Sequence, residues 1–194
     1  MKIDLRALAL AITFIAVCAP HAVFAEAAVA TPVDGSYAQF RQLAEPLRLI
    51  DTLGAQVVKM TMTNEDAQRH SEKWRQALIA AFERRLSGKR GAIIDAVMSE
   101  AFKSFTPAEV QRLSVICQSP AVAHFESRKI EAMRRGESTT GLVRAESGFR
   151  EMSLEDLRLL SRINTAIAQG LPLSTPIWRP LLRDAWHDAD AVGQ

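Results

Sequence analysis

The sequence predicts an all-α protein, an irregular helical bundle of about six to eight helices in a single domain. Apolar residues recur at spacings of three and four along most of the chain, as they do on one face of a helix. Ser, Thr and Asn stand before several of these stretches, where they cap helix starts. No stretch shows the alternation of apolar and polar residues that is typical of a strand.

Residues 1–25 are typical of a secretory signal peptide, with a basic start, an apolar run over 7–19 and small residues before the cleavage site. As a helix this run would be about 20 Å long, shorter than the roughly 30 Å hydrocarbon core of a membrane. We therefore expect cleavage near Ala25/Glu26 and a periplasmic or secreted protein. Retention as a membrane anchor and lipidation of Cys18 are the alternatives.

The remaining chain is expected to be a flexible lead-in over 26–36 and a helical domain over 37–194, with no transmembrane segment. The full sequence has a formal net charge of +2, which does not favour a nucleic-acid partner. Loss of Cys18 with the signal peptide leaves Cys117 without a disulfide partner. The domain must then be stabilised by its core, and we expect no cofactor.

The first half of the domain predicts three helical stretches. The stretch 37–62 carries apolar residues spaced by three or four, and Pro46 within it predicts a break or a kink. A second helix begins after Asn64 and ends near Gly88, with apolar residues at every fourth position. A third apolar pattern covers 94–105.

Residues 105–120, FTPAEVQRLSVICQSP, carry the sharpest local signals in the chain. Thr106 is expected to cap a helix, Pro107 suits its first position, and Glu109 can reach back to the cap amide. Ser119-Pro120 repeats the pattern of a cap followed by proline. The stretch therefore predicts the end of one helix and the start of the next.

The second half predicts a helix over 120–135, a break at 136–141 where the domain could divide, and a short helix within 142–150. A helix with a broad apolar face follows over 153–170, and an amphipathic turn and helix over 176–191. The segments FTPAEVQRLS and MSLEDLRLLS look alike. Either a weak duplication or shared capping residues would explain that similarity.

The stretch around Thr106 also resembles the signature F-T-x-x-E-[LV]-x-x-L followed by S-P of an uncharacterised bacterial secreted family, a domain of unknown function. The resemblance implies a helical, exported protein, and it supplies no catalytic residues. The matching residues are Phe105, Thr106, Glu109, Val110, Leu113, Ser119 and Pro120.

Asp184, His187 and Asp188 form the cluster that most resembles a metal site. At i, i+3 and i+4 they share one helix face, and imidazole with carboxylate suits zinc. The alternative is that they are the solvated face of an amphipathic helix. None of the histidines lies in an H-E-x-x-H pattern.

Arg84, Arg85, Lys89 and Arg90 form a basic cluster that could meet anionic lipid head groups or cell-wall polymer. The alternative is that these cations complement the C-terminal end of a helix and are solvated.

Trp178, Leu182 and Trp186 could form a surface for a ligand or partner, because tryptophan is favoured at binding hot spots. The alternative places the tryptophans in the core.

The remaining histidine and cysteine positions do not indicate a functional site. His70, four residues before Trp74, is expected to pack against it. His124 and Glu126 are two apart and should point in different directions on a helix. Cys117 lies on an apolar face and is interpreted as a buried, unreactive thiol.

The leading functional hypothesis is an exported, non-enzymatic helical protein that binds a protein partner or an apolar small molecule. One alternative is a small envelope enzyme or metal-binding protein that uses Asp184, His187 and Asp188, or the region of Glu109. The other is a peripheral protein with weak contacts to an anionic membrane surface.

Overall fold

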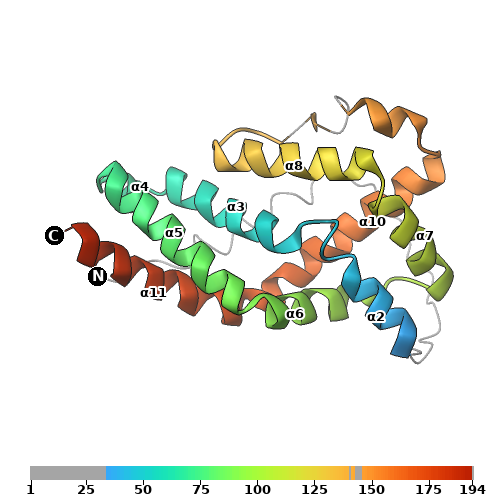
Figure 1. The fold of residues 1–194 in the computed structure, drawn as a ribbon, viewed down its shortest axis with the longest axis horizontal. Helices are drawn as coiled ribbons and strands as arrows, with labels where there is room; N and C mark the ends of the chain where they lie inside the picture. The colour runs from blue at the N-terminus through green and yellow to red at the C-terminus, as the bar shows by residue number, and fades with distance from the viewer. Residues whose placement is uncertain (1–33, 140, 143–145, 194) are drawn as a thin grey trace.

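Helices form all of the regular secondary structure in the part of the chain that a computed structural model describes, residues 34–139, 141–142 and 146–193. This confirms the all-α prediction. The predicted signal peptide and most of the lead-in lie outside the described residues. The elements in chain order (Figure 1) are α2 (Asp34–Gln42), α3 (Leu49–Thr63), α4 (Glu65–Gln68), α5 (Glu72–Gly88), α6 (Arg90–Phe102), α7 (Pro107–Cys117), α8 (Pro120–Arg134), the 3-10 helix η2 (Ser147–Glu151), α10 (Leu154–Gly170), the 3-10 helix η3 (Leu171–Ser174) and α11 (Thr175–Gly193).

Local capping explains where five of these helices begin, namely α4, α5, α7, α8 and α10. Side-chain oxygens of Asn64, Ser71, Ser119 and Ser153 each accept a hydrogen bond from a backbone N–H in the first turn of the helix that follows. Thr106 forms the complete capping box with its partner carboxylate at the start of α7. The predicted starts of α7, α8 and α10 are therefore confirmed.

Pairs of neighbouring helices build the bundle. α11 packs along α5, α10 along α6, and α8 along α3. Figure 1 shows α8 beside α3 at the edge of the bundle opposite α11. Buried side chains from every helix named above meet in one core, to which α8 contributes Val122. A second, smaller cluster between α3 and α8 contains Ala55, Ile130 and Met133.

Two of the expected boundaries were wrong. The helix expected from Asn64 to Gly88 is two helices, α4 and α5, because Ser71 caps a new start at Glu72. The lead-in was expected to extend to Ser36, but α2 begins two residues earlier, at Asp34.

The predicted breaks are confirmed where the backbone turns. The chain leaves α2 before Pro46 and re-enters a helix after Arg48, whose φ of 49° is left-handed. Gly136 follows α8 with φ 74°, the conformation in which glycine ends helices at low cost. The short helix predicted within 142–150 is represented by η2 in the described residues. None of the described helices has both the length and the apolar character that a membrane-spanning helix needs.

Candidate functional site

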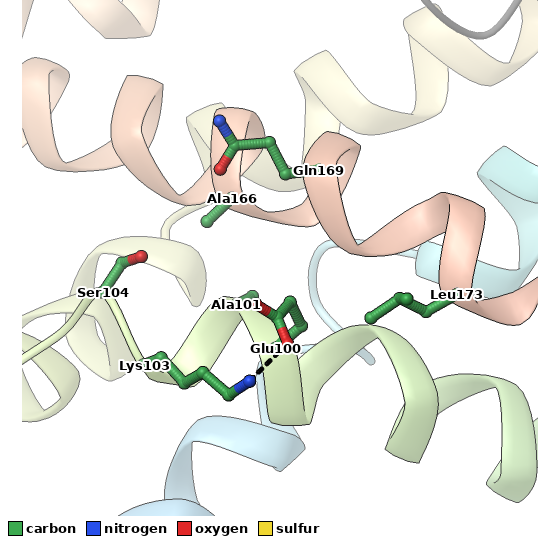
Figure 2. Close-up of a pocket in the computed structure, with 7 residues that line it drawn as sticks. All are labelled: Glu100, Ala101, Lys103, Ser104, Ala166, Gln169 and Leu173. Carbon is green, nitrogen blue, oxygen red and sulfur yellow. Dashed lines mark hydrogen bonds and ion pairs between the residues drawn. The ribbon is translucent and has the colours of Figure 1, made fainter.

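A pocket of about 280 Å³ opens between the end of α6, the last turns of α10 and η3 (Figure 2). Figure 2 shows Gln169 and Ala166 on α10 across the opening from α6, with Leu173 of η3 at one end. The pocket is lined by Glu100, Ala101, Lys103, Ser104, Ala166, Gln169 and Leu173. Its volume lies just below the usual range for ligand sites, so it suits a small ligand.

A close approach of α6 and α10 forms the floor of this pocket. Ala101 and Ala166 are both buried on the facing sides of the two helices. Further along, Gly170 lies so close to α6 that an added Cβ would be 2.7 Å from the carbonyl oxygen of Val97. The absence of a side chain at position 170 therefore sets the separation of the two helices beside the pocket.

Charged and polar groups form the rim. Lys103 Nζ donates a hydrogen bond to Glu100 Oε2 at 2.6 Å; the Lys103 side chain is largely exposed and that of Glu100 is partly exposed. Arg162 Nη2 donates to the carbonyl oxygen of Ser104 at 2.8 Å. The rim is thus mixed in charge and provides both donors and acceptors.

The FTPAEV motif lies directly beside this rim, where it joins α7 to α10. Glu109 Oε2 accepts the amide of Thr106 at 2.9 Å, and its Oε1 accepts Arg162 Nη1 at 2.5 Å. The guanidinium of Arg162 also lies over the ring of Phe105, 5.1 Å from its centroid. The residues of the motif therefore cap a helix and bind the neighbouring helix.

A second ion pair joins the same two helices with the roles exchanged, because here the arginine belongs to α7 and the carboxylate to the first turn of α10. Arg112 Nε donates to Asp156 Oδ1 at 2.7 Å, while Asp156 Oδ2 accepts the hydroxyl of Ser153, the N-cap of α10. We call these two connections, Arg112–Asp156 and Arg162–Glu109, the α7–α10 clasp.

Hydrogen bonding keeps both clasp carboxylates ionised. Partial burial opposes the charged form of Glu109, but hydrogen bonds from Arg162 and Thr106 outweigh it and lower the pKa of Glu109. Hydrogen bonds from Arg112 and then Ser153 lower the pKa of Asp156.

The tryptophan surface predicted at Trp178, Leu182 and Trp186 divides between the core and an aromatic cluster. Trp178 is buried in the core, 2% exposed, and Leu182 is half-buried against it. Trp186 is half-buried and meets Trp74 edge-on, with ring centroids 4.7 Å apart. The His70 ring stacks on the Trp74 ring, with centroids 3.9 Å apart, which confirms the predicted packing of these two side chains.

Neither charged cluster predicted from the sequence stands apart as a free site. Asp188 Oδ2 forms an ion pair with Arg85 Nη1 at 2.5 Å, and Asp184 Oδ1 forms one with Arg183 Nε at 3.5 Å. His187 is exposed. Within the described ranges no group of three His, Cys, Asp or Glu side chains is arranged to hold a metal ion.

The basic cluster is partly used in contacts between helices. Arg85 binds α11 through Asp188, and Arg90 forms an ion pair with Glu45 before α3. Arg84 and Lys89 are exposed, so a smaller cationic surface remains there.

Sequence reasoning missed a pair formed by His124 on α8 and Glu146 before η2. The imidazole Nδ1 lies 2.7 Å from Glu146 Oε2, and the carboxylate is buried while the imidazole is exposed. Gly148 allows this contact, because a Cβ there would be 2.6 Å from Ala121 Cβ on α8. A fixed Nδ1 with an exposed Nε2 is an arrangement suited to proton transfer or to ligation.

Cys117 lies in the core, and burial raises the pKa of its thiol to about 12, with a further contribution from Glu126.

Comparisons with family models, with curated proteins and with solved structures returned no match for this chain. Membership of the family that the motif resembles therefore stays a prediction. In the structure the matching residues have structural roles, as caps and core side chains.

Proposed function

We propose that this chain is an exported helical protein of the bacterial envelope that binds a small molecule of mixed polarity between α6, α10 and η3. The proposal of export is supported by the composition of residues 1–25. The proposal of binding is supported by the pocket, which is the observation that carries it.

The walls of the pocket favour a ligand with one apolar and one polar part. Leu173 is 51% exposed and adjoins the buried methyl groups of Ala101 and Ala166, so an apolar ligand group would remove this surface from water. The polar part would meet the amide of Gln169 and the ion pair of the rim. That exposed pair is worth about 1 kcal/mol or less, so a ligand can displace it at low cost.

Native mass spectrometry of the protein purified gently from periplasm tests this proposal. We expect an additional mass on the wild-type protein, lost in Leu173→Asp and kept in Leu154→Asp. Leu154 is a matched control, because it is 63% exposed and does not line the pocket. A ligand at one hundred times its Kd adds about 2.7 kcal/mol to stability, which also raises the melting temperature.

The same three proteins are then tested by thermal shift with a short-chain fatty acid, an alkylamine and a neutral amino acid as probes. The proposal is wrong if the wild type retains no additional mass and no probe raises its melting temperature. It is also wrong if Leu173→Asp binds as well as Leu154→Asp, because the ligand would then lie elsewhere.

A further inference from the structure

Glu126 is a titratable group in the interior that the proposed binding site does not use. It lies on α8 and is 1% exposed. Lys129, one turn further along the same helix, forms an ion pair with Oε2, but the contact lacks hydrogen-bond geometry. In the described structure Oε2 accepts no hydrogen bond. The ion pair with Lys129 offsets only part of the hydration that this buried oxygen loses.

The neighbouring helix does not supply the missing bond. α8 packs along α3, and the hydroxyl of Thr52 on α3 is also buried without a hydrogen bond in the described residues. Arg48, just before α3, is directed to other partners, since its guanidinium donates to Asp51 at 2.9 Å and to Ser127 at 3.1 Å.

The charged and titratable groups that influence Glu126 come from three elements. Lys129 on α8 and Arg48 before α3 favour the ionised carboxylate. Cys117 at the end of α7 is close enough for the carboxylate to disfavour its thiolate. Burial has the largest effect and outweighs both cations, so the pKa of Glu126 is raised above its ordinary value of 4.5.

Part of the contact between α8 and α3 lies outside the main core. The C-terminal half of α8 contacts α3 through Ala55, Ile130 and Met133, a small cluster separate from the main core. Beyond it the chain turns away at Gly136, in the left-handed conformation. A segment with few buried apolar contacts opens more readily than the core does.

We propose that Glu126 makes the docking of α8 onto α3 pH-sensitive, with tighter docking when the carboxyl is protonated and weaker docking when it is ionised. The sign follows from the direction of the shift. A carboxyl whose pKa is raised in the folded state stabilises that state fully below its ordinary value of 4.5. That contribution is lost as the pH rises through the folded value.

Hydrogen-exchange mass spectrometry of peptides within 120–134 tests the proposal, from pH 4.5 to pH 8 with correction for intrinsic exchange rates. In the wild type we expect protection of α8 to fall severalfold as the pH rises over this range. Glu126→Gln removes the titrating group and should make the protection independent of pH. Glu131→Gln, on the same helix but exposed, should behave like the wild type.

A second variant keeps the test decisive if Glu126→Gln does not fold. Lys129→Met removes the cation that favours ionised Glu126, so protection should fall more steeply with pH than in the wild type. Flat wild-type protection overturns the proposal. So does a Glu126→Gln profile that keeps the wild-type slope, or a Lys129→Met profile that matches the wild type.

Discussion

Replacing Gly170 by alanine tests the close approach of α6 and α10 on which the pocket depends. The new Cβ would lie 2.7 Å from the carbonyl oxygen of Val97 and 3.3 Å from both its Cα and its Cγ1. Two of these three atoms belong to the backbone and cannot rotate away. The two helices must therefore move apart, which also changes the pocket.

Two opposing effects set the size of the change. Alanine is favoured over glycine in a helix by about 1 kcal/mol, and Gly170 has helical backbone angles. Overpacking of a well-packed core costs about 1–3 kcal/mol, and contact with the rigid backbone puts this site at the upper end. We therefore expect Gly170→Ala to lower the free energy of unfolding by about 1–2 kcal/mol, which lowers the melting temperature by roughly 2–8 °C.

Two other glycines in helices provide matched controls. Gly88 has no atom within 4 Å of an added Cβ, and at Gly54 the nearest atom is Leu86 Cδ2 at an ordinary 3.7 Å. Gly88→Ala and Gly54→Ala should be neutral or stabilising by up to about 1 kcal/mol. Urea unfolding of the three variants gives the comparison. If Gly170→Ala were as stable as Gly88→Ala, the helices would not be in the contact described here.

Two further predictions concern ionisable groups. The pKa values of Glu109 and Asp156 are lowered, so the α7–α10 clasp should stabilise the protein at neutral pH and lose this effect as the pH falls below their ordinary values of 4.5 and 3.8. In urea unfolding at pH 7 and pH 3, the double variant Glu109→Gln, Asp156→Asn should therefore lose less stability on acidification than the wild type. An equal loss in both proteins would contradict this. The pKa of Cys117 is raised from 9.0 to about 12, which leaves about a thousandfold less thiolate at pH 8 than an ordinary cysteine would have. Maleimide should therefore label the native protein at least about a thousandfold more slowly than the urea-unfolded protein. Rapid labelling of the native protein would show that the thiol is accessible.

Features that depend on a few consecutive residues could be predicted from the sequence. Thr106, Ser119 and Ser153 were identified as caps because the groups they bond lie within the next three residues. Ser71 was missed, although it caps α5 in the same way. The apolar spacing suggested one helix from Asn64 onward, and the capping signal inside that pattern was not recognised.

Contacts between distant positions could not be predicted, because many pairings were equally acceptable. The chain has 24 basic and 22 acidic side chains, and nothing local joins His124 to Glu146. The pocket depends on the same kind of information. Gly170 was correctly interpreted as the end of a helix, but its sequence neighbours do not indicate that Val97 lies against it.

The α7–α10 clasp bears on the similarity between FTPAEVQRLS and MSLEDLRLLS. In both helices the acid three residues after the cap serves its own cap and also accepts an arginine from the other helix. A duplication with two-fold symmetry would place the two arginines at equivalent positions. Arg112 is six residues after Thr106 (112 − 106), whereas Arg162 is nine after Ser153 (162 − 153). The unequal spacing favours shared capping requirements over duplication as the source of the similarity, since capping fixes the acid but leaves the position of the arginine to the packing of the two helices.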